Sequence, residues 1–151
     1  MRISRTLQLI VLAVAFTALS PANGLTEVDL LSNDRLIEAT KAADLKSAED
    51  LLNRKHNIEV REQNGRTPLI FAAGRGSEDF VELLVKYKAK IDAVDKFGNS
   101  PIYYAAAGNH AGVVEILLES GAKLNSQNRR GLTPLMIAAS EGHLSTVQAL
   151  V

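Results

Sequence analysis

Two histidines at a fixed interval are the residues of this chain whose spacing first suggests chemistry, namely metal binding. His110 and His143 lie 33 residues apart, and His56 stands alone. A zinc site needs three or four ligands converging at about 2.0 to 2.3 Å. The sequence contains no cysteine, and no third ligand accompanies the pair. We therefore predict no metal site and no cofactor, and we expect both imidazoles to lie near the loop at the start of a helix.

Nucleophilic and phosphate-binding chemistry has equally little support. Thr67, Ser100 and Thr133 are the hydroxyl residues with a regular pattern, but each precedes a proline and fits the cap of a helix. The stretch 74–76, Gly-Arg-Gly, lacks the lysine and the strand-to-helix context of a phosphate-binding loop. We interpret it as the end of a helix. The sequence therefore predicts no catalytic residues and a protein that is not an enzyme.

These pairs of a hydroxyl residue and a proline belong to a motif that recurs every 33 residues. Its copies read NGRTPL at 64–69, FGNSPI at 97–102 and RGLTPL at 130–135. A period of this length is typical of stacked repeat proteins, in which each copy buries its apolar face against its neighbours. An earlier, degenerate copy begins near Asp34. The same register holds in four further columns: Ala72, Ala105 and Ala138; Ala73, Ala106 and Ala139; Val81, Val114 and Val147; Leu84, Leu117 and Leu150.

The motif and its period resemble those of the ankyrin repeat family. Three in-register copies of Gly-x-(Thr/Ser)-Pro-(Leu/Ile)-x-x-Ala-Ala carry the resemblance, which covers residues 34–151. It implies an all-α helical solenoid of about 3.5 repeats, in which helix-turn-helix units are joined by β-hairpin loops. Ile70, Tyr103 and Met136 stand where the family favours histidine. We expect repeats at about 34–63, 64–96, 97–129 and 130–151, the last of them incomplete.

Each repeat also carries its own signals for helix start and stop. A hydroxyl residue at the N-cap stabilises a helix by about 0.5 to 2 kcal/mol, and a proline fits the first helical position. Gly76, Asn109 and Gly142 share a column after the first helix, where a left-handed C-terminal cap accepts glycine or asparagine. Apolar residues at helical spacing follow, and then a short extended segment. Because such helices are too short to be stable alone, neighbouring repeats must stabilise them.

The first 24 residues have the layout of a secretory signal peptide. Arg2 and Arg5 precede an apolar run of 13 residues at 7–19, and small residues follow it. The run is shorter than the roughly 20 residues of a membrane-spanning helix, although an uncleaved anchor is the alternative. Cleavage after Ala22 or after Gly24 fits the pattern. We expect residues 25–33 to be a linker or a short capping helix, followed by the repeat domain at 34–151.

Composition and charge indicate the compartment and the class of partner. A protein without cysteine suits a bacterial periplasm better than a disulfide-rich extracellular medium, so we predict a periplasmic or secreted protein. Loss of residues 1–24 would leave 15 basic and 17 acidic residues. Such a surface has no general attraction for nucleic acid or anionic lipid. We therefore predict a protein partner, no nucleic acid, and no membrane contact after signal cleavage.

Because the sequence predicts no catalytic or metal site, we expect the repeat surface to act by recognising another protein. Phe97 is a large apolar residue at an expected exposed tip, and aromatic and arginine residues dominate the energy of protein interfaces. The arginines would supply forked donors suited to carboxylates. The alternative is that Phe97 packs on its own loop and the arginines serve solubility. In the ankyrin family the loop tips and the inner face of the first helices usually meet partners, which places candidate contacts at Gln63, Asn64, Arg66, Arg75, Lys96, Phe97, Asn99, Tyr104, Arg129, Arg130 and Leu132.

The last repeat adds a second hypothesis. We expect Leu144, Val147, Leu150 and Val151 to form an exposed apolar edge, at a cost of about 1.5 to 3 kcal/mol for each side chain left unburied. Either a longer array continues past Val151 or this edge pairs with another surface. The first function hypothesis is thus an exported, non-enzymatic module that binds a protein or peptide. The alternative is a self-associating structural protein, or a fragment of a longer ankyrin array.

Overall fold

The computed structural model describes the backbone of residues 27–151 and the side chains of residues 35–151. The predicted signal peptide, residues 1–24, lies outside this part of the chain. Of the two units into which the chain divides, Met1–Leu31 and Ser32–Val151, the second contains the repeats. None of the helices within 27–151 combines the length and the apolar character needed to cross a bilayer.

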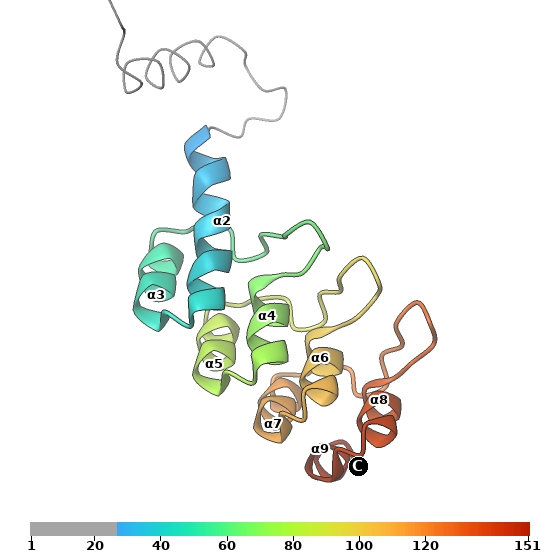
Figure 1. Cartoon of the computed structure of the whole chain (residues 1–151). Coiled ribbons are helices and arrows are strands. Elements are labelled where there is room, and N and C mark those ends of the chain that lie inside the picture. Colours follow the sequence, from blue (N-terminus) through green and yellow to red (C-terminus); the bar gives the residue numbers. More distant parts are fainter. Residues whose placement is uncertain (1–26) are drawn as a thin grey trace, which may run out of the picture. The chain divides into compact units, whose positions relative to one another are not determined.

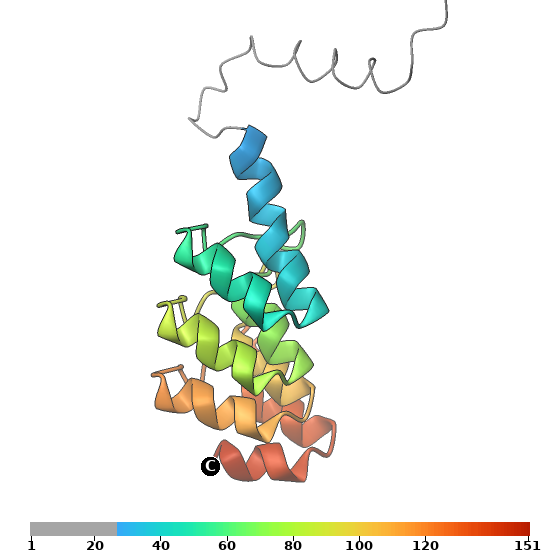
Figure 2. The same cartoon turned by 90° about the vertical axis from the view of Figure 1, so that its left-hand side faces the viewer.

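Eight helices and no strand make up the secondary structure of residues 27–151. They are α2 (Glu27–Ala42), α3 (Leu45–Asn53), α4 (Pro68–Arg75), α5 (Glu78–Lys86), α6 (Pro101–Ala107), α7 (Ala111–Glu119), α8 (Pro134–Ser140) and α9 (Leu144–Ala149). In the second unit, successive helix pairs stack on one another, and the loops after α3, α5 and α7 project to the same side (Figure 1). Seen after a turn of 90°, the second helices of the pairs form one row (Figure 2). The predicted all-α helical solenoid is confirmed.

The helices begin and end where the repeat chemistry predicts. Thr67, Ser100 and Thr133 each accept a hydrogen bond from the backbone N–H three residues on, at 3.2 to 3.4 Å, and the helix starts at the following proline. These caps satisfy donors that have no partner within the helix. Left-handed residues follow α4, α6 and α8 in the predicted column: Gly76 (φ 74°), Asn109 (φ 58°) and Gly142 (φ 73°).

The core lies between successive helix pairs. Leu84 and Leu117 are fully buried, and Leu150 in the same column is 3% exposed. Phe80 of α5 is also buried, and α5 contacts both α3 and α7. Each such side chain contributes about 1.5 to 3 kcal/mol of burial free energy. The apolar columns of the sequence therefore become a continuous interior shared by neighbouring repeats.

The prediction of an exposed apolar edge was wrong for Leu150. Its column faces the preceding helix pair, so α7 covers Leu150 whether or not another repeat follows. Val147 is half-buried, while Leu144 and Val151 are 70% and 90% exposed. The prediction treated every apolar residue at the end of the chain as facing away from the preceding helices. Helix α9 instead packs one face against α7 and α8.

Other columns face the following repeat. Ile70 is buried, whereas Met136, in the same column of the last repeat, is 52% exposed. Ala73 and Ala106 are likewise buried and Ala139 is exposed. The exposed apolar surface at this end of the described stack therefore includes Met136 and Ala139.

Two local features differ from the sequence-based expectations. Helix α2 runs without a break from Glu27 to Ala42, so the boundary expected between residues 33 and 34 falls inside a helix. No proline or glycine interrupts this stretch, and each added residue extends the ladder of backbone hydrogen bonds. The loops contain hairpin-type turns without the extended strands that a β-hairpin implies. In the second loop, for example, Asp95 N–H donates to Asn99 O and Gly98 N–H donates to Asp95 O, both at 3.1 Å.

Candidate partner-binding site

The tips of the three loops form a row joined by backbone hydrogen bonds. Lys96 N–H donates to Asn64 O, and Arg129 N–H donates to Phe97 O, each at 3.0 Å. Gly98 permits the second of these contacts, because a Cβ at this position would lie 2.9 Å from the Arg129 nitrogen. The row of tips is therefore held together by the backbone itself.

A buried carboxylate shapes the second tip. Asp95 Oδ1 accepts the backbone N–H groups of Phe97 and Asn99 at 2.8 and 2.9 Å. Its Oδ2 accepts the Tyr104 hydroxyl at 2.7 Å. Burial, together with this hydrogen bond, raises the pKa of Tyr104, so the phenol stays protonated and keeps donating at neutral pH. Asn99 and Tyr104, both predicted as contact residues, thus make hydrogen bonds within the chain.

Asn128 has the same role in the third tip, one repeat after Asp95. Its Oδ1 accepts the backbone N–H groups of Arg130 and Leu132 at 2.9 and 3.0 Å. Its Nδ2 donates to Asn99 Oδ1 at 2.9 Å, which connects the second and third tips through side chains. Leu132 is half-buried. The conformations of both tips are therefore determined by intramolecular bonds.

A pocket of about 370 Å³ lies between the second and third tips. Phe97 and Tyr103 supply its aromatic lining, and Lys96, Arg129 and Arg130 supply three cations. Phe97 is 59% exposed, which confirms the expected exposed tip. Within residues 35–151, none of the three cations forms an ion pair. The arrangement presents apolar surface and unneutralised positive charge side by side.

The two other predicted arginines make contacts within the chain. Arg66 forms an ion pair with Glu62, and its guanidinium carbon lies 4.5 Å from the ring centroid of Phe71. Arg75 donates to the backbone oxygen of Lys41, one repeat earlier. These contacts stabilise the inner helix face and orient both guanidinium groups. The remaining predicted residues, Gln63 and Asn64, are exposed at the first tip.

The two histidines connect neighbouring repeats. His110 Nε2 lies 3.2 Å from Gly74 O, and His143 Nε2 lies 3.1 Å from Ala107 O, 36 residues earlier in each case. Both residues are the N-caps of their helices, α7 and α9, as expected from their place after the loop. Among the described residues, no group of three or more His, Cys, Asp or Glu side chains is placed to hold a metal ion.

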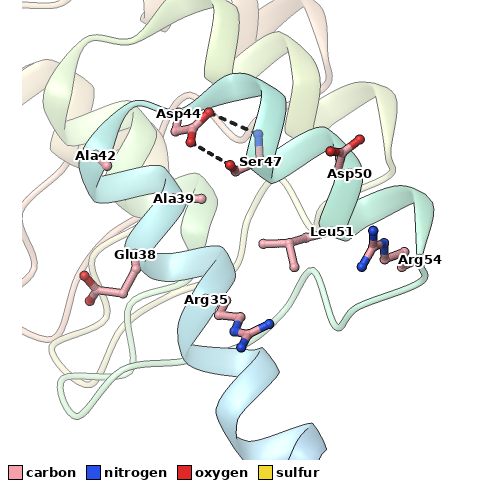
Figure 3. A pocket seen from close by; sticks show the side chains of 9 residues that line it. All are labelled: Arg35, Glu38, Ala39, Ala42, Asp44, Ser47, Asp50, Leu51 and Arg54. Atoms are coloured by element: carbon pink, nitrogen blue, oxygen red, sulfur yellow. Dashed lines mark hydrogen bonds between the residues drawn. The ribbon is translucent and has the colours of Figure 1, made fainter.

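A second pocket, of about 520 Å³, lies between α2 and α3 (Figure 3). Arg35 and Arg54 flank Leu51 there, and the rest of the lining combines acidic side chains with two alanines and a serine. Asp44 accepts the Ser47 hydroxyl at 2.6 Å and its N–H at 3.1 Å, and these bonds hold the pKa of Asp44 below its usual value. Because charged side chains of both signs line it, we interpret this pocket as a solvated surface of the first helix pair.

Sequence reasoning missed two residues of the tip region. Tyr103 lines the pocket, although the sequence left open which of the adjacent tyrosines would reach the surface. Asn128 was not selected at all. Its signal was present in the register, because Asn128 stands one period after Asp95 and both are residues that bond to the backbone of a turn.

Comparison with known families agrees with this architecture. The family model described as ankyrin repeats (3 copies) matches residues 36–128, and that described as ankyrin repeats (many copies) matches residues 112–151. A search of curated proteins found no match. Ankyrin repeats are generally modules of protein–protein interaction, and proteins built from them are typically not enzymes. With its period, capped helices and linked loop tips, the chain belongs to the ankyrin repeat family.

Proposed function

We propose that this protein is an exported, non-enzymatic module that binds a partner protein or peptide through its loop tips and inner helix face. The observation that carries the proposal is the pocket between the second and third tips, with Phe97 exposed beside three cations. Aromatic and arginine residues supply most of the energy in protein interfaces. Because hydrogen bonds already hold the tips in place, binding loses little conformational entropy there.

Removal of the proposed anchor groups should strongly reduce capture of the partner. In a pull-down from periplasmic extract, Phe97→Ala, and separately Arg129→Ala with Arg130→Ala, should each reduce capture about tenfold or more, as expected for central interface residues. Leu144→Ala is the control for Phe97→Ala, because it also truncates an exposed apolar side chain. Undiminished capture by both tip variants would refute this site.

Export is proposed from the N-terminal pattern, and it predicts a defined mature protein. After expression in a bacterium, the chain should be recovered from the periplasm with Asn23 or Leu25 as its first residue, according to the cleavage site used. Cell fractionation and intact mass measure both properties. A chain that keeps residues 1–24 and stays in the cytoplasm would contradict export, whereas an intact chain in the membrane fraction would favour the uncleaved anchor.

Self-association is the second candidate, favoured by one observation. Met136, Leu144 and Val151 are exposed apolar residues at the end of the described stack. An oligomer that persists in light scattering without any co-purified protein, and that dissociates on Met136→Glu, would support this candidate over the first.

A further inference from the structure

We propose that the pocket between the second and third tips takes an acidic peptide segment in which a carboxylate neighbours an apolar side chain. The inference rests on the proposed partner-binding function and specifies the chemistry of the partner. The carboxylate would lie against Arg129, Arg130 and Lys96, and the apolar side chain would contact Phe97 and Tyr103.

Charge is distributed unequally over the repeat domain. The tip segments 61–66, 94–99 and 127–132 carry five basic and two acidic side chains. Helices α5 and α7 carry one basic and five acidic side chains. Of the two acids in the tips, Glu62 is paired with Arg66, and Asp95 is buried and bonded to Tyr104. The row of tips therefore attracts anions although the protein as a whole does not.

The cations of the pocket are suited to a carboxylate. Arg129 and Arg130 are exposed neighbours, and neither guanidinium is neutralised within the described residues. A guanidinium binds a carboxylate through two parallel hydrogen bonds, which are stronger than bonds between neutral groups. Arg66 and Arg75, in contrast, are already engaged within the chain. Arg61, the fifth basic residue of the tips, donates to Gly65 O and Val94 O. The free basic groups of the tip segments are thus concentrated at this one pocket.

The aromatic wall is suited to an apolar neighbour of that carboxylate. The Tyr103 ring packs edge-on against the Tyr104 ring, with centroids 6.2 Å apart and planes at 88°. Tyr104 is itself held by Asp95, so the Tyr103 ring packs against a neighbour whose position is fixed by a hydrogen bond. Phe97, more than half exposed, offers a second ring on the rim. An isolated carboxylate or a small inorganic anion would leave this surface uncovered.

The combination is particular to the second and third tips. One repeat earlier, Gln63 and Asn64 stand in the columns of Lys96 and Phe97. The first tip therefore lacks the cation and the ring at these two positions, although its turn has the same two backbone hydrogen bonds. Because the first turn folds without a cation or a ring at these positions, the turn does not require Lys96 and Phe97. These two side chains are instead features of the pocket.

A peptide fits these features better than a phosphate polymer does. Binding to nucleic acid commonly engages a long row of phosphates with many cations. Here three cations meet in one small pocket, and the acidic helices α5 and α7 would repel a polyanion lying along the domain.

Fluorescence anisotropy with defined probes tests the proposal. The probe is a fluorescein-labelled peptide in which glutamates flank a phenylalanine, and its partner probe has glutamine in place of glutamate. The full-length chain, purified in the form that the cell produces, should bind the glutamate peptide about tenfold more tightly than the glutamine peptide. The difference should shrink as salt is raised.

Charge-neutral variants locate the effect. Arg129→Gln with Arg130→Gln should weaken binding of the glutamate peptide about tenfold, whereas Lys46→Gln with Lys86→Gln, which removes the same charge outside the tips, should change it less than about twofold. Phe97→Ala should weaken binding of both peptides. Circular dichroism of each variant should match that of the unmodified chain, because the substituted side chains are exposed.

Several outcomes would overturn the acidic-peptide proposal. They are equal binding of the two peptides, no binding of either, an equal effect of the two double variants, or tighter binding of an oligouridylate that is lost with the same arginines. Partner binding itself is judged separately in the pull-down. Capture that is lost with Phe97→Ala but kept with Arg129→Gln and Arg130→Gln would leave the binding function standing and refute only the acidic partner.

Discussion

Leu117→Ala should lower the free energy of unfolding by about 2 to 5 kcal/mol, as large-to-small substitutions in a well-packed core do. Leu117 is fully buried between helix pairs, where its removal leaves a cavity lined by neighbouring repeats. Leu144→Ala is the matched control, because the same atoms are removed from a side chain that is 70% exposed. We expect that variant to change stability by less than about 0.5 kcal/mol.

The free energy of unfolding of both variants can be measured by urea unfolding, with linear extrapolation to zero urea. Circular dichroism at about 222 nm follows the loss of helix. The prediction concerns the shared interior, since a repeat protein is stabilised mainly by interfaces between its units. Equal effects of the two substitutions would mean that Leu117 does not lie in such an interface.

Gly76→Ala should destabilise the protein by about 2 to 4 kcal/mol, and Gly142→Ala by about 1 to 2 kcal/mol. Both glycines end a first helix with nearly the same left-handed φ, 74° and 73°. A Cβ at Gly142 would meet no atom within 4 Å, whereas a Cβ at Gly76 would clash with His110 Nδ1. The backbone cost is therefore common to both, and the excess at Gly76 comes from displacing the imidazole and its hydrogen bond to Gly74.

The excess can be assigned to the histidine by repeating the measurement with His110→Ala. In that background Gly76→Ala should cost no more than Gly142→Ala does in the unmodified chain, because the steric conflict is gone. Thermal or urea unfolding of the unmodified chain, the three single variants and the Gly76→Ala, His110→Ala double variant supplies the comparison. An excess that persists without the imidazole would contradict the role given to His110 as a link between repeats.

The fold was predictable because its signals are local and repeated. Thr67, Ser100 and Thr133 could be recognised as helix caps from the proline that follows each of them, and Gly76 as a left-handed stop from its column. The point at which the first helix begins was not predictable in the same way. Helix α2 has no cap or breaker near Asp34, so nothing in the local sequence separates the first repeat from the residues before it.

The direction in which a column faces was also beyond the sequence pattern. Leu150 and Met136 are both apolar residues of the last repeat, yet one is buried and the other is half exposed. Periodicity identifies which residues lie on the apolar face of a helix. It does not say whether they meet the preceding or the following repeat, and that direction decides their burial at the end of a stack.

The candidate site could be predicted only as a region. Register and the resemblance led to the tips, and Phe97 is exposed there as expected. They could not separate Asn99 and Tyr104, which bond within the chain, from Arg129 and Arg130, which remain unpaired among the described residues. That distinction depends on the fold of the second loop, which brings the Asp95 carboxylate within hydrogen-bond distance of Asn99, four residues on, and of Tyr104, nine residues on.

Hydrogen–deuterium exchange, with and without the captured partner, tests the central claim most directly. If the row of loop tips is the binding surface, added partner should slow exchange in segments 94–99 and 127–132 and leave α5 and α7 unchanged. Slowed exchange confined to α5 and α7, with the tips unaffected, would contradict the account and place the partner on the opposite side of the repeats.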